Sequence, residues 1–258
     1  WRAAAGCWCN RGGGGWGDGG AGCQVTVARC SWATSGARIH VGGPRTQVGV
    51  AVRSGGRTTV ATVEHCRVRS VTLQNVPSFV LIDDLPLRIG PRSVKVAVAY
   101  GGAFYAILPS EAFEIPVEPA YLPRLIELGR EIKAKVEAVK EVVHPLNAEL
   151  RDIYGVIFTQ GNRNVTIFAD GEVDRSPCGS GTSARLALLD WRGELARGTA
   201  LMHESIVGTQ FSGRVLGDAQ VGEVPAVITE GAGGAHYPGP HRLAPVGADP
   251  SGRGSPRG

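Results

Sequence analysis

The stretch from Asp174 to Ala187 places one cysteine, Cys178, between a proline and a glycine at the point where an extended segment gives way to a helix. Before it, Val165 to Asp174 forms two short β-rich runs joined by Asp170-Gly171, a dipeptide typical of hairpin turns. After it, Thr182 to Leu195 carries apolar side chains at helical spacing, which predicts an amphipathic helix. The stretch therefore requires a strand, a glycine-rich loop and a helix that begins beside Cys178.

The loop around Cys178 has more than one chemical interpretation. Free N–H groups and the positive end of the helix dipole bind anions at a helix N-terminus and lower the pKa of a thiol, which favours a reactive Cys178 near the Asp174 carboxylate. The plainer alternatives are a buried cysteine that acts as a small apolar side chain and an aspartate that only caps a turn. A phosphate-binding loop is disfavoured because no Gly-Lys-Ser or Gly-Lys-Thr follows.

Short β-type runs separated by Gly, Pro and Asp dominate the rest of the chain and predict a meandering sheet. The predicted strands are Val48–Val52, Thr58–Val63, Val68–Leu73, Phe79–Ile82, Val94–Tyr100, Tyr154–Thr159, Ser205–Val215 and Val224–Thr229. Between them, Glu118 to Val143 has apolar residues at i, i+3 and i+4 spacing and predicts an amphipathic helix that Pro145 ends. The helix after Cys178 is expected to end near Gly198.

Two glycines, Gly101 and Gly102, interrupt the β-aromatic run from Ala99 to Ile107. Glycine inside a strand pattern marks either a bulge or a place where the backbone closely approaches a ligand. Both interpretations stay open from the sequence.

The two ends of the chain differ in composition from its middle. Residues 1–46 are rich in Gly, Arg, Cys and Trp without a regular period, so we expect them to be poorly ordered, and we expect Gly231 to Gly258 to form a loose tail. The chain begins with Trp1 rather than Met, which suggests a fragment. No metal site is expected, because the Cys-x-Cys spacing of Cys7 and Cys9 is unusual for zinc ligands and the histidines are scattered.

Charge and hydropathy restrict the partners and the location. A net charge of +4 without a cluster of basic and aromatic residues gives little support to nucleic-acid binding. No long apolar run and no secretory signal is present, so we expect no membrane partner and a cytoplasmic protein with reduced cysteines.

Four motifs in one order resemble the proline racemase family, which contains proline racemases, hydroxyproline 2-epimerases and trans-3-hydroxyproline dehydratases. They extend over about two-thirds of the chain, and the Cys178 motif is the most specific. The motifs are Val71-Thr-Leu-Gln-Asn-Val-Pro-Ser-Phe79, Ala99-Tyr-Gly-Gly-Ala-Phe-Tyr105, Asp174-Arg-Ser-Pro-Cys-Gly-Ser-Gly-Thr-Ser-Ala184 and Glu204-Ser-Ile-Val-Gly-Thr-Gln-Phe211.

The resemblance implies an α/β fold like that of diaminopimelate epimerase, with two lobes that each wrap a mixed sheet around a central helix. In this chain the second lobe would comprise residues 79–230 and carry Cys178. An incomplete first lobe would comprise residues 47–78 together with the returning tail, residues 231–258.

The resemblance also implies the chemistry. The family uses no cofactor: one cysteine thiolate removes the α-proton of the substrate, and a second cysteine on the opposite face reprotonates the carbanion. By this resemblance Cys178 is one acid/base, Asp174 holds the ring nitrogen, and the N–H groups of Gly179 and Ser180 hold the carboxylate. The second cysteine belongs to a Met-Cys-Gly-His-Gly-Thr motif, and no Cys-Gly-His occurs in this sequence; its place would fall near Cys23, where Gln24 and Val25 follow instead.

Three functions remain open on the sequence. The first is racemisation or epimerisation of proline or a hydroxyproline, impaired if the second cysteine is missing. The second is dehydration of trans-3-hydroxy-L-proline. In the dehydratase branch Thr stands at the position that resembles Cys178, so the cysteine in this chain favours the epimerase. Epimerases in turn often carry Asn at the position of Ala103, so the alanine in this chain favours the dehydratase. The third is an inactive remnant of the family that at most binds a small-molecule substrate analogue, a proline-like acid, or forms a homodimer through its exposed sheet.

Overall fold

The computed structural model of this 258-residue chain describes residues 69–168 and 170–234, the side chains of residues 59–62, and the backbone of the strands that precede residue 69. The elements are β1 Cys7–Cys9, β2 Cys23–Val27, β3 Arg38–Val41, β4 Arg45–Val52, β5 Gly55–Glu64, β6 Arg67–Gln74, β7 Phe79–Ile89, β8 Arg92–Tyr100, β9 Phe104–Pro109, the 3-10 helices η1 Ser110–Phe113 and η2 Pro119–Tyr121, α1 Leu122–Val139, β10 Val143–His144, β11 Asn147–Arg151, β12 Ile153–Gln160, β13 Arg163–Phe168, α2 Gly179–Trp191, β14 Leu201–Ser205, β15 Gln210–Val221 and β16 Val224–Gly233.

Eleven strands form one mixed sheet in the order β4-β5-β6-β16-β15-β14-β13-β12-β9-β8-β7. Most neighbours are antiparallel, while β12 pairs with β9 and β13 pairs with β14 in parallel. Ser78, which precedes β7, pairs with Val227 of β16 through two backbone hydrogen bonds of 2.8 Å. This contact joins the β7 edge to β16, so the strands from β16 to β7 close around a central space.

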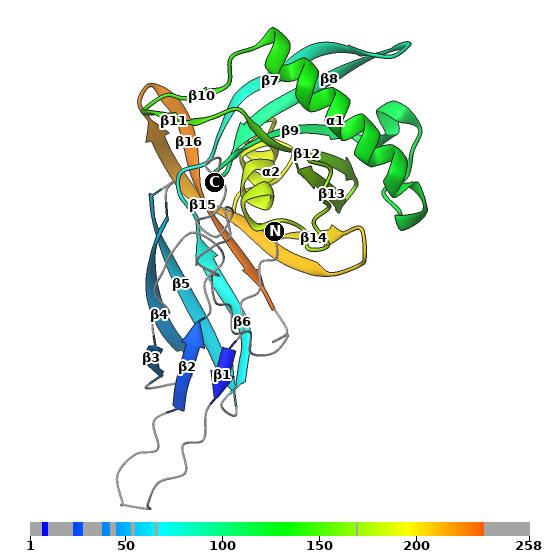
Figure 1. Ribbon diagram of the computed structural model, residues 1–258. Helices are drawn as coiled ribbons and strands as arrows, with labels where there is room; N and C mark the ends of the chain where they lie inside the picture. Colours follow the sequence, from blue (N-terminus) through cyan, green and yellow to red (C-terminus); the bar gives the residue numbers. More distant parts are fainter. Residues whose placement is uncertain are drawn as a thin grey trace, which may run out of the picture.

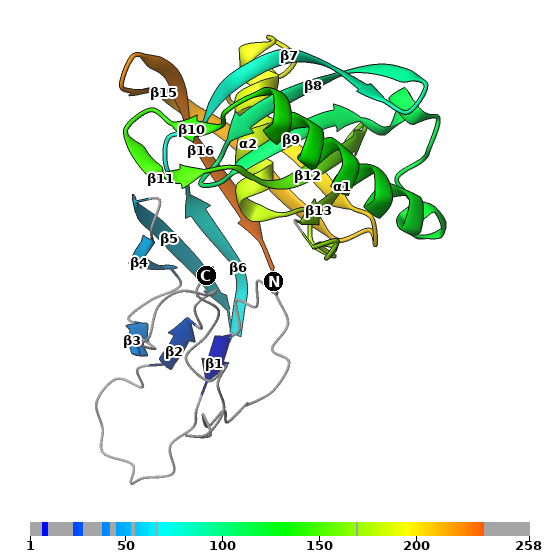
Figure 2. The ribbon, with the colours of Figure 1, turned by 45° about the horizontal axis from the view of Figure 1, so that its top comes forward.

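Helix α2 occupies that space and α1 covers the outside of the sheet (Figures 1 and 2). Helix α2 contacts β7, β8, β9, β15 and β16, whereas α1 packs on β7, β9, β12 and β13. The strands that lie between the two helices are consequently apolar on both faces. On β9, for example, Phe104 and Leu108 pack in the core under α1, whereas Tyr105 and Ile107 pack against α2. The predicted α/β class, with a mixed sheet around a central helix, is confirmed for this part of the chain.

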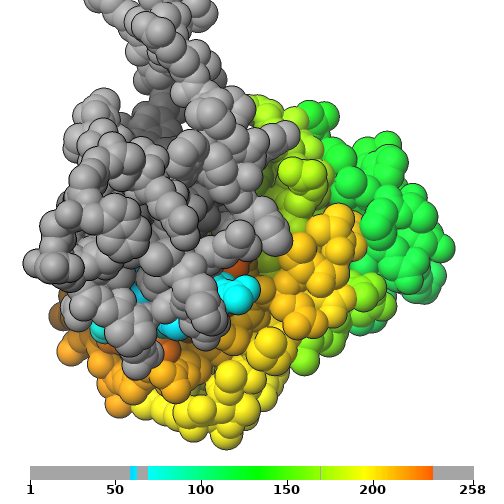
Figure 3. Space-filling model, turned by 90° about the horizontal axis from the view of Figure 1, so that it is seen from below, coloured from blue at the N-terminus to red at the C-terminus, as the bar shows by residue number. Residues whose placement is uncertain are grey.

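Strands β4, β5 and β6 extend the sheet beyond the closed part, where β6 pairs with β16 (Figure 1). Three strands of the segment predicted to be poorly ordered, β1 to β3, form a separate antiparallel sheet, and the rest of residues 1–44 lies outside the described residues. Seen from below, the yellow and orange surface belongs to the chain that follows α2, and the green surface to the part around α1 (Figure 3).

The predicted helix bounds need correction. The helix expected over Glu118–Val143 comprises only Leu122–Val139, because a 3-10 turn precedes it and Lys140 is already extended, so that Val143 can pair in β10. The helix after Cys178 ends at Trp191 rather than near Gly198. There Gly193 adopts a φ of +68° and the N–H of Glu194 bonds to Leu189, which is the geometry of a glycine C-cap.

The amphipathic character predicted for this second helix is wrong. Every residue from Gly181 to Leu188 is buried, because the closed sheet surrounds the helix. Trp191, expected on its apolar face, is 54% exposed.

The predicted strand Ser205–Val215 is interrupted by a turn at residues 206–209. The last strand continues to Gly233, so the start of the expected tail is ordered. Residues 235–258 lie outside the described residues.

Candidate active site

The loop before α2 is organised by the side chain of Asp174. Its Oδ1 accepts hydrogen bonds from the backbone N–H of Ser176, at 2.9 Å, and from the Ser176 hydroxyl, at 2.8 Å. The Ser176 oxygen in turn accepts the N–H of Cys178 at 3.2 Å. Asp174 therefore does cap a turn, as one interpretation of the sequence held, and through that turn it positions Cys178.

The backbone of Cys178 has a conformation that few non-glycine residues adopt. Its φ is +67° and its ψ is 114°, at the N-cap of α2. Neighbouring groups hold it there: Asn164 donates its Nδ2–H to the carbonyl of Pro177 at 3.1 Å, and Thr182 donates both its N–H and its hydroxyl to the carbonyl of Cys178, at 2.8 and 2.7 Å. Strain of this kind costs about 1–3 kcal/mol and is concentrated at functional sites.

The thiol points into the closed part of the sheet, where Cys178 is 4% exposed. The Tyr105 hydroxyl lies 3.6 Å from Sγ, and the N–H of Gly181 and the hydroxyl of Thr166 also face it. Burial and the charge of Asp174 raise the pKa of Cys178 to about 12, although these three groups act in the opposite direction. The sequence predicted a lowered thiol pKa; that prediction is wrong for this state of the molecule, because loss of solvation outweighs the donors at the helix N-terminus.

The two residues after Cys178 contribute backbone N–H groups at the start of α2. Gly179 and Ser180 belong to the first turn of α2, whose N–H groups have no acceptor within the helix. Gly179 is exposed, and a Cβ added to it would meet nothing within 4 Å among the described residues. A Cβ at Gly181 would instead lie 2.9 Å from Ile157 Cδ1 and 3.0 Å from Cys178 Sγ. Glycine at 181 therefore leaves the space that the thiol occupies.

At position 101, in the β8–β9 turn, only a residue without a side chain fits. A Cβ there would lie 2.2 Å from the carbonyl oxygen of Ser180 and 2.5 Å from the amide nitrogen of Ala184. The carbonyl of Gly101 also accepts a 2.7 Å hydrogen bond from Asn75. The sequence left a bulge and a close approach to a ligand open for this pair; the structure instead shows a close approach of the turn to helix α2.

Sequence reasoning missed three polar residues around the thiol: Tyr105, Thr182 and His203. Nδ1 of His203, from β14, lies 2.8 Å from the hydroxyl oxygen of Thr182. Because that hydroxyl donates its one hydrogen to Cys178, it accepts from the Nδ1–H of His203. Burial and the nearby Arg185 lower the pKa of His203 to about 3, which keeps the ring neutral. The signal available in the sequence was the alternation of Leu201–Ser205, which turns this histidine inward.

Other candidates lie apart from this site. The structure does not describe the side chain of Cys23. The same holds for the other cysteines and the histidines that could be considered as metal ligands, which are Cys7, Cys9, Cys30, His236 and His241. Among the described residues, no group of three or more His, Cys, Asp or Glu side chains could hold a metal ion. Within the same part of the chain, no helix is both long and apolar enough to cross a membrane.

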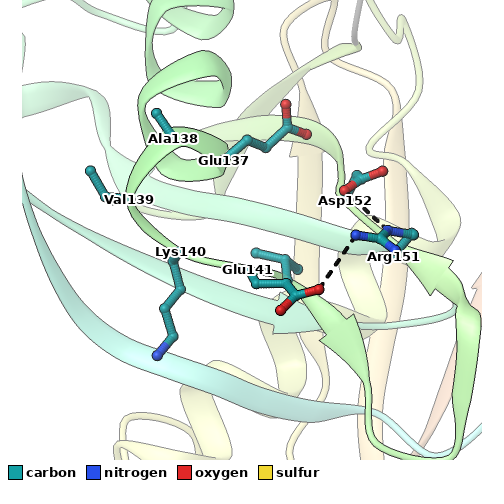
Figure 4. A pocket seen from close by; sticks show the side chains of 8 residues that line it. Glu137, Ala138, Val139, Lys140, Glu141, Arg151 and Asp152 are labelled. Carbon is teal, nitrogen blue, oxygen red and sulfur yellow. Dashed lines mark hydrogen bonds and ion pairs between the residues drawn. The ribbon is translucent and has the colours of Figure 1, made fainter.

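A shallow hollow of about 350 Å³ lies at the C-terminal end of α1, away from Cys178 (Figure 4). Its lining contains acidic and basic side chains. Glu141 forms an ion pair with Arg151, and Arg151 also pairs with Asp152. These ion pairs join three of the charged side chains of the lining, and the hollow contributes no group to the thiol site.

The chain is similar in sequence to curated proteins of known name. The chain is 43% identical over 190 residues to a trans-3-hydroxy-L-proline dehydratase from Bacillus cereus, covering 71% of this chain and 57% of that protein. It is 42% identical over 204 residues to a 3-hydroxyproline 2-epimerase from Burkholderia multivorans, covering 76% of this chain and 61% of that one. This chain thus spans less than two-thirds of the length of these curated relatives.

A solved structure has the same fold. A hydroxyproline epimerase from Agrobacterium vitis, crystallised with bound trans-4-OH-L-proline, matches with a TM-score of 0.73 and 33% identity over 76% of this chain and 59% of that one. The sequence model described as proline racemase matches residues 19–255. The chain belongs to the proline racemase family.

Proposed function

We propose that this chain removes and returns the α-proton of proline or a hydroxyproline with Cys178 as the acid/base, and so supports racemisation or epimerisation. The observation that carries the proposal is the thiol of Cys178 in a strained turn at the start of α2, beside the exposed residue Gly179. A thiol acts on the α-proton, and amide N–H groups stabilise the negative charge that develops on the substrate carboxylate.

The remaining groups have distinct roles in this proposal. The N–H groups of Gly179 and Ser180 hold the substrate carboxylate. Asp174 holds the ring nitrogen: in the described part of the chain only its Oδ1 is hydrogen-bonded, which leaves Oδ2 for the substrate. No cofactor takes part in the proposed proton transfer.

Substrate binding would also activate the thiol. Without substrate, the charge of Asp174 is one of the causes that raise the pKa of Cys178 to about 12. The ring nitrogen of proline is cationic at neutral pH, so its pairing with Asp174 would neutralise that charge and favour the thiolate. The thiolate would then form where the α-proton is present to be taken.

Inversion needs a second proton donor on the opposite face of the substrate. The Cys-Gly-His motif that supplies it in the family does not occur in these 258 residues, and Cys23 is followed by Gln24 instead. Cys178 by itself would exchange the α-proton with retention of configuration, so racemisation or epimerisation requires a proton donor other than this motif on the opposite face.

Dehydration of trans-3-hydroxy-L-proline is the second candidate. It is favoured by the similarity to the Bacillus cereus dehydratase and by Ala103 in the β8–β9 hairpin. The elimination removes the α-proton and releases the 3-hydroxyl as water once that group has gained a proton, so no proton returns to the opposite face of Cα. A single thiol could therefore serve this reaction.

Product analysis distinguishes the candidates. The protein is incubated in deuterated water with L-proline, trans-4-hydroxy-L-proline and trans-3-hydroxy-L-proline, and products are followed by NMR and chiral chromatography. Deuterium at Cα with inversion indicates an epimerase, deuterium without inversion indicates Cys178 acting alone, and a cyclic imine trapped by a reducing enzyme indicates the dehydratase. No change with any of the three, and no difference from Cys178→Ser, would leave only an inactive member of the family.

A further inference from the structure

The Tyr105 hydroxyl lies between two partners, and only one of them can receive its hydrogen at a time. It is 2.7 Å from the Ser180 Oγ and 3.6 Å from the Cys178 Sγ. Tyr105 is completely buried, while Ser180 is partly exposed at the open end of the α2 turn. The three side chains thus form a line from the buried thiol toward the proposed carboxylate site.

The number of hydrogens fixes two possible arrangements of this line. When Cys178 is a thiol, its S–H can donate to the Tyr105 oxygen and Tyr105 donates to Ser180 over the shorter distance. A thiolate can only accept, so the Tyr105 O–H must then turn to Sγ, and the Tyr105 oxygen accepts from the Ser180 hydroxyl. The reversal rotates the O–H groups of Tyr105 and Ser180 and breaks no O–H bond. The one covalent bond to hydrogen that breaks is the S–H bond of Cys178, whose proton passes to a base in solution when the thiolate forms.

We propose that Tyr105 and Ser180 form a hydroxyl relay that reverses its hydrogen-bond direction when Cys178 loses its proton, and thereby stabilises the thiolate in a buried site. Tyr105 acts in this as a positioning residue. The proposal rests on the proposed function only in that Cys178 takes up and releases a proton; the reversal itself requires no substrate.

The surroundings explain why such a relay is needed. Among the described residues, the other titratable groups that face this line are Asp174 on the loop, Tyr154 on β12 and, through Thr182, the neutral His203 on β14. None of these is a cation that could compensate a negative sulfur. The compensating groups that do face Sγ are neutral donors, and Tyr105 is the only one of them joined to a second hydroxyl.

The relay is tested by the rate at which iodoacetamide alkylates Cys178, followed by mass spectrometry of the Cys178 peptide at a pH well below the pKa of the thiol. There the rate is proportional to the thiolate fraction. Tyr105→Phe is expected to slow the reaction about tenfold, the usual effect of losing one hydrogen bond to a charged group. Ser180→Ala should slow it less, and in the Tyr105→Phe background it should change the rate no further.

Tyr100→Phe is the matched control, because it removes a buried tyrosine hydroxyl from the same hairpin on the opposite face of the sheet. Its alkylation rate should equal that of the wild type. If Tyr105→Phe fails to fold, the partly exposed Ser180→Ala still decides the question through its own rate. An unchanged or faster rate in Tyr105→Phe, an unchanged rate in Ser180→Ala alone, or independent effects in the double variant, overturns the relay. Because no substrate is used, these outcomes do not depend on whether the chain acts on proline.

Discussion

Gly101→Ala should destabilise the protein far more than its size suggests. The new Cβ would lie 2.2 Å from the Ser180 carbonyl oxygen and 2.5 Å from the Ala184 nitrogen, whereas real Cβ contacts are essentially never shorter than 3.0 Å. The turn and helix α2 must therefore separate by about 0.8 Å, and both contacts are with backbone atoms that cannot rotate away.

Overpacking of this kind costs about 3 kcal/mol or more at such distances. The lower entropy of the unfolded alanine variant returns at most about 1 kcal/mol, so the free energy of unfolding should fall by about 2 kcal/mol or more. Because the strain acts on the first turns of α2, alkylation of Cys178 should also become faster as the thiol gains access to solvent.

Urea unfolding of the purified variants measures the effect. Gly217→Ala serves as the matched control: it is a strand glycine for which an added Cβ meets nothing within 4 Å. Its free energy of unfolding should stay within about 0.5 kcal/mol of the wild type, as is usual for surface changes. If Gly101→Ala unfolds at the same urea concentration as this control, the close contact between the hairpin and α2 is refuted.

Three further predictions concern the core, pH and the thiol. Ile132→Ala, at a fully buried position of α1, should lower the free energy of unfolding by about 2–5 kcal/mol, whereas Val139→Ala, at 60% exposure, should change little; thermal unfolding compares them. The pKa of His203 is lowered from 6.5 to about 3, so between these pH values the unfolded chain binds a proton that the folded chain does not. The free energy of unfolding should therefore fall as the pH drops from 6.5 toward 3, by at most about 1.4 kcal/mol per pH unit. His203→Gln should show a flatter dependence on pH. Asp174→Asn keeps an oxygen for the Ser176 turn but loses the charge that raises the pKa of Cys178, so Cys178 alkylation should be faster; a slower reaction would contradict this electrostatic assignment.

Much of the strand content could be predicted because Gly, Pro and Asp punctuate the β-type runs. Val94 to Tyr100, for example, differs from β8 only at its first residues. The character of α2 could not be predicted: periodicity reveals a helix with one solvent face, and this helix has almost none. The bridge between Ser78 and Val227 that encloses α2 joins residues far apart in the chain, so no local pattern announces it.

The residues of the candidate site could be located from the sequence, but their electrostatic environment could not. The motif located Cys178 and Asp174, and the turn chemistry of Asp174 followed from its residue type. The raised pKa of the thiol depends on how completely the sheet closes over it, which is a tertiary property. The contact between Tyr105 and Cys178 could not be predicted for a similar reason. Tyr105 belongs to an aromatic run in the sequence, and its hydroxyl reaches Cys178 only through the tertiary fold.

The central claim, that Cys178 exchanges the α-proton of a proline-type substrate, is tested most directly by proton NMR in deuterated water. The α-proton signal of L-proline or trans-4-hydroxy-L-proline is followed with the wild type and with Cys178→Ala, using Gly217→Ala as a folded control. The account predicts loss of the signal with the wild type and the control, and no loss with Cys178→Ala. Equal rates of loss with the wild type and Cys178→Ala, or a signal that persists in all three while the proteins remain folded, would contradict it.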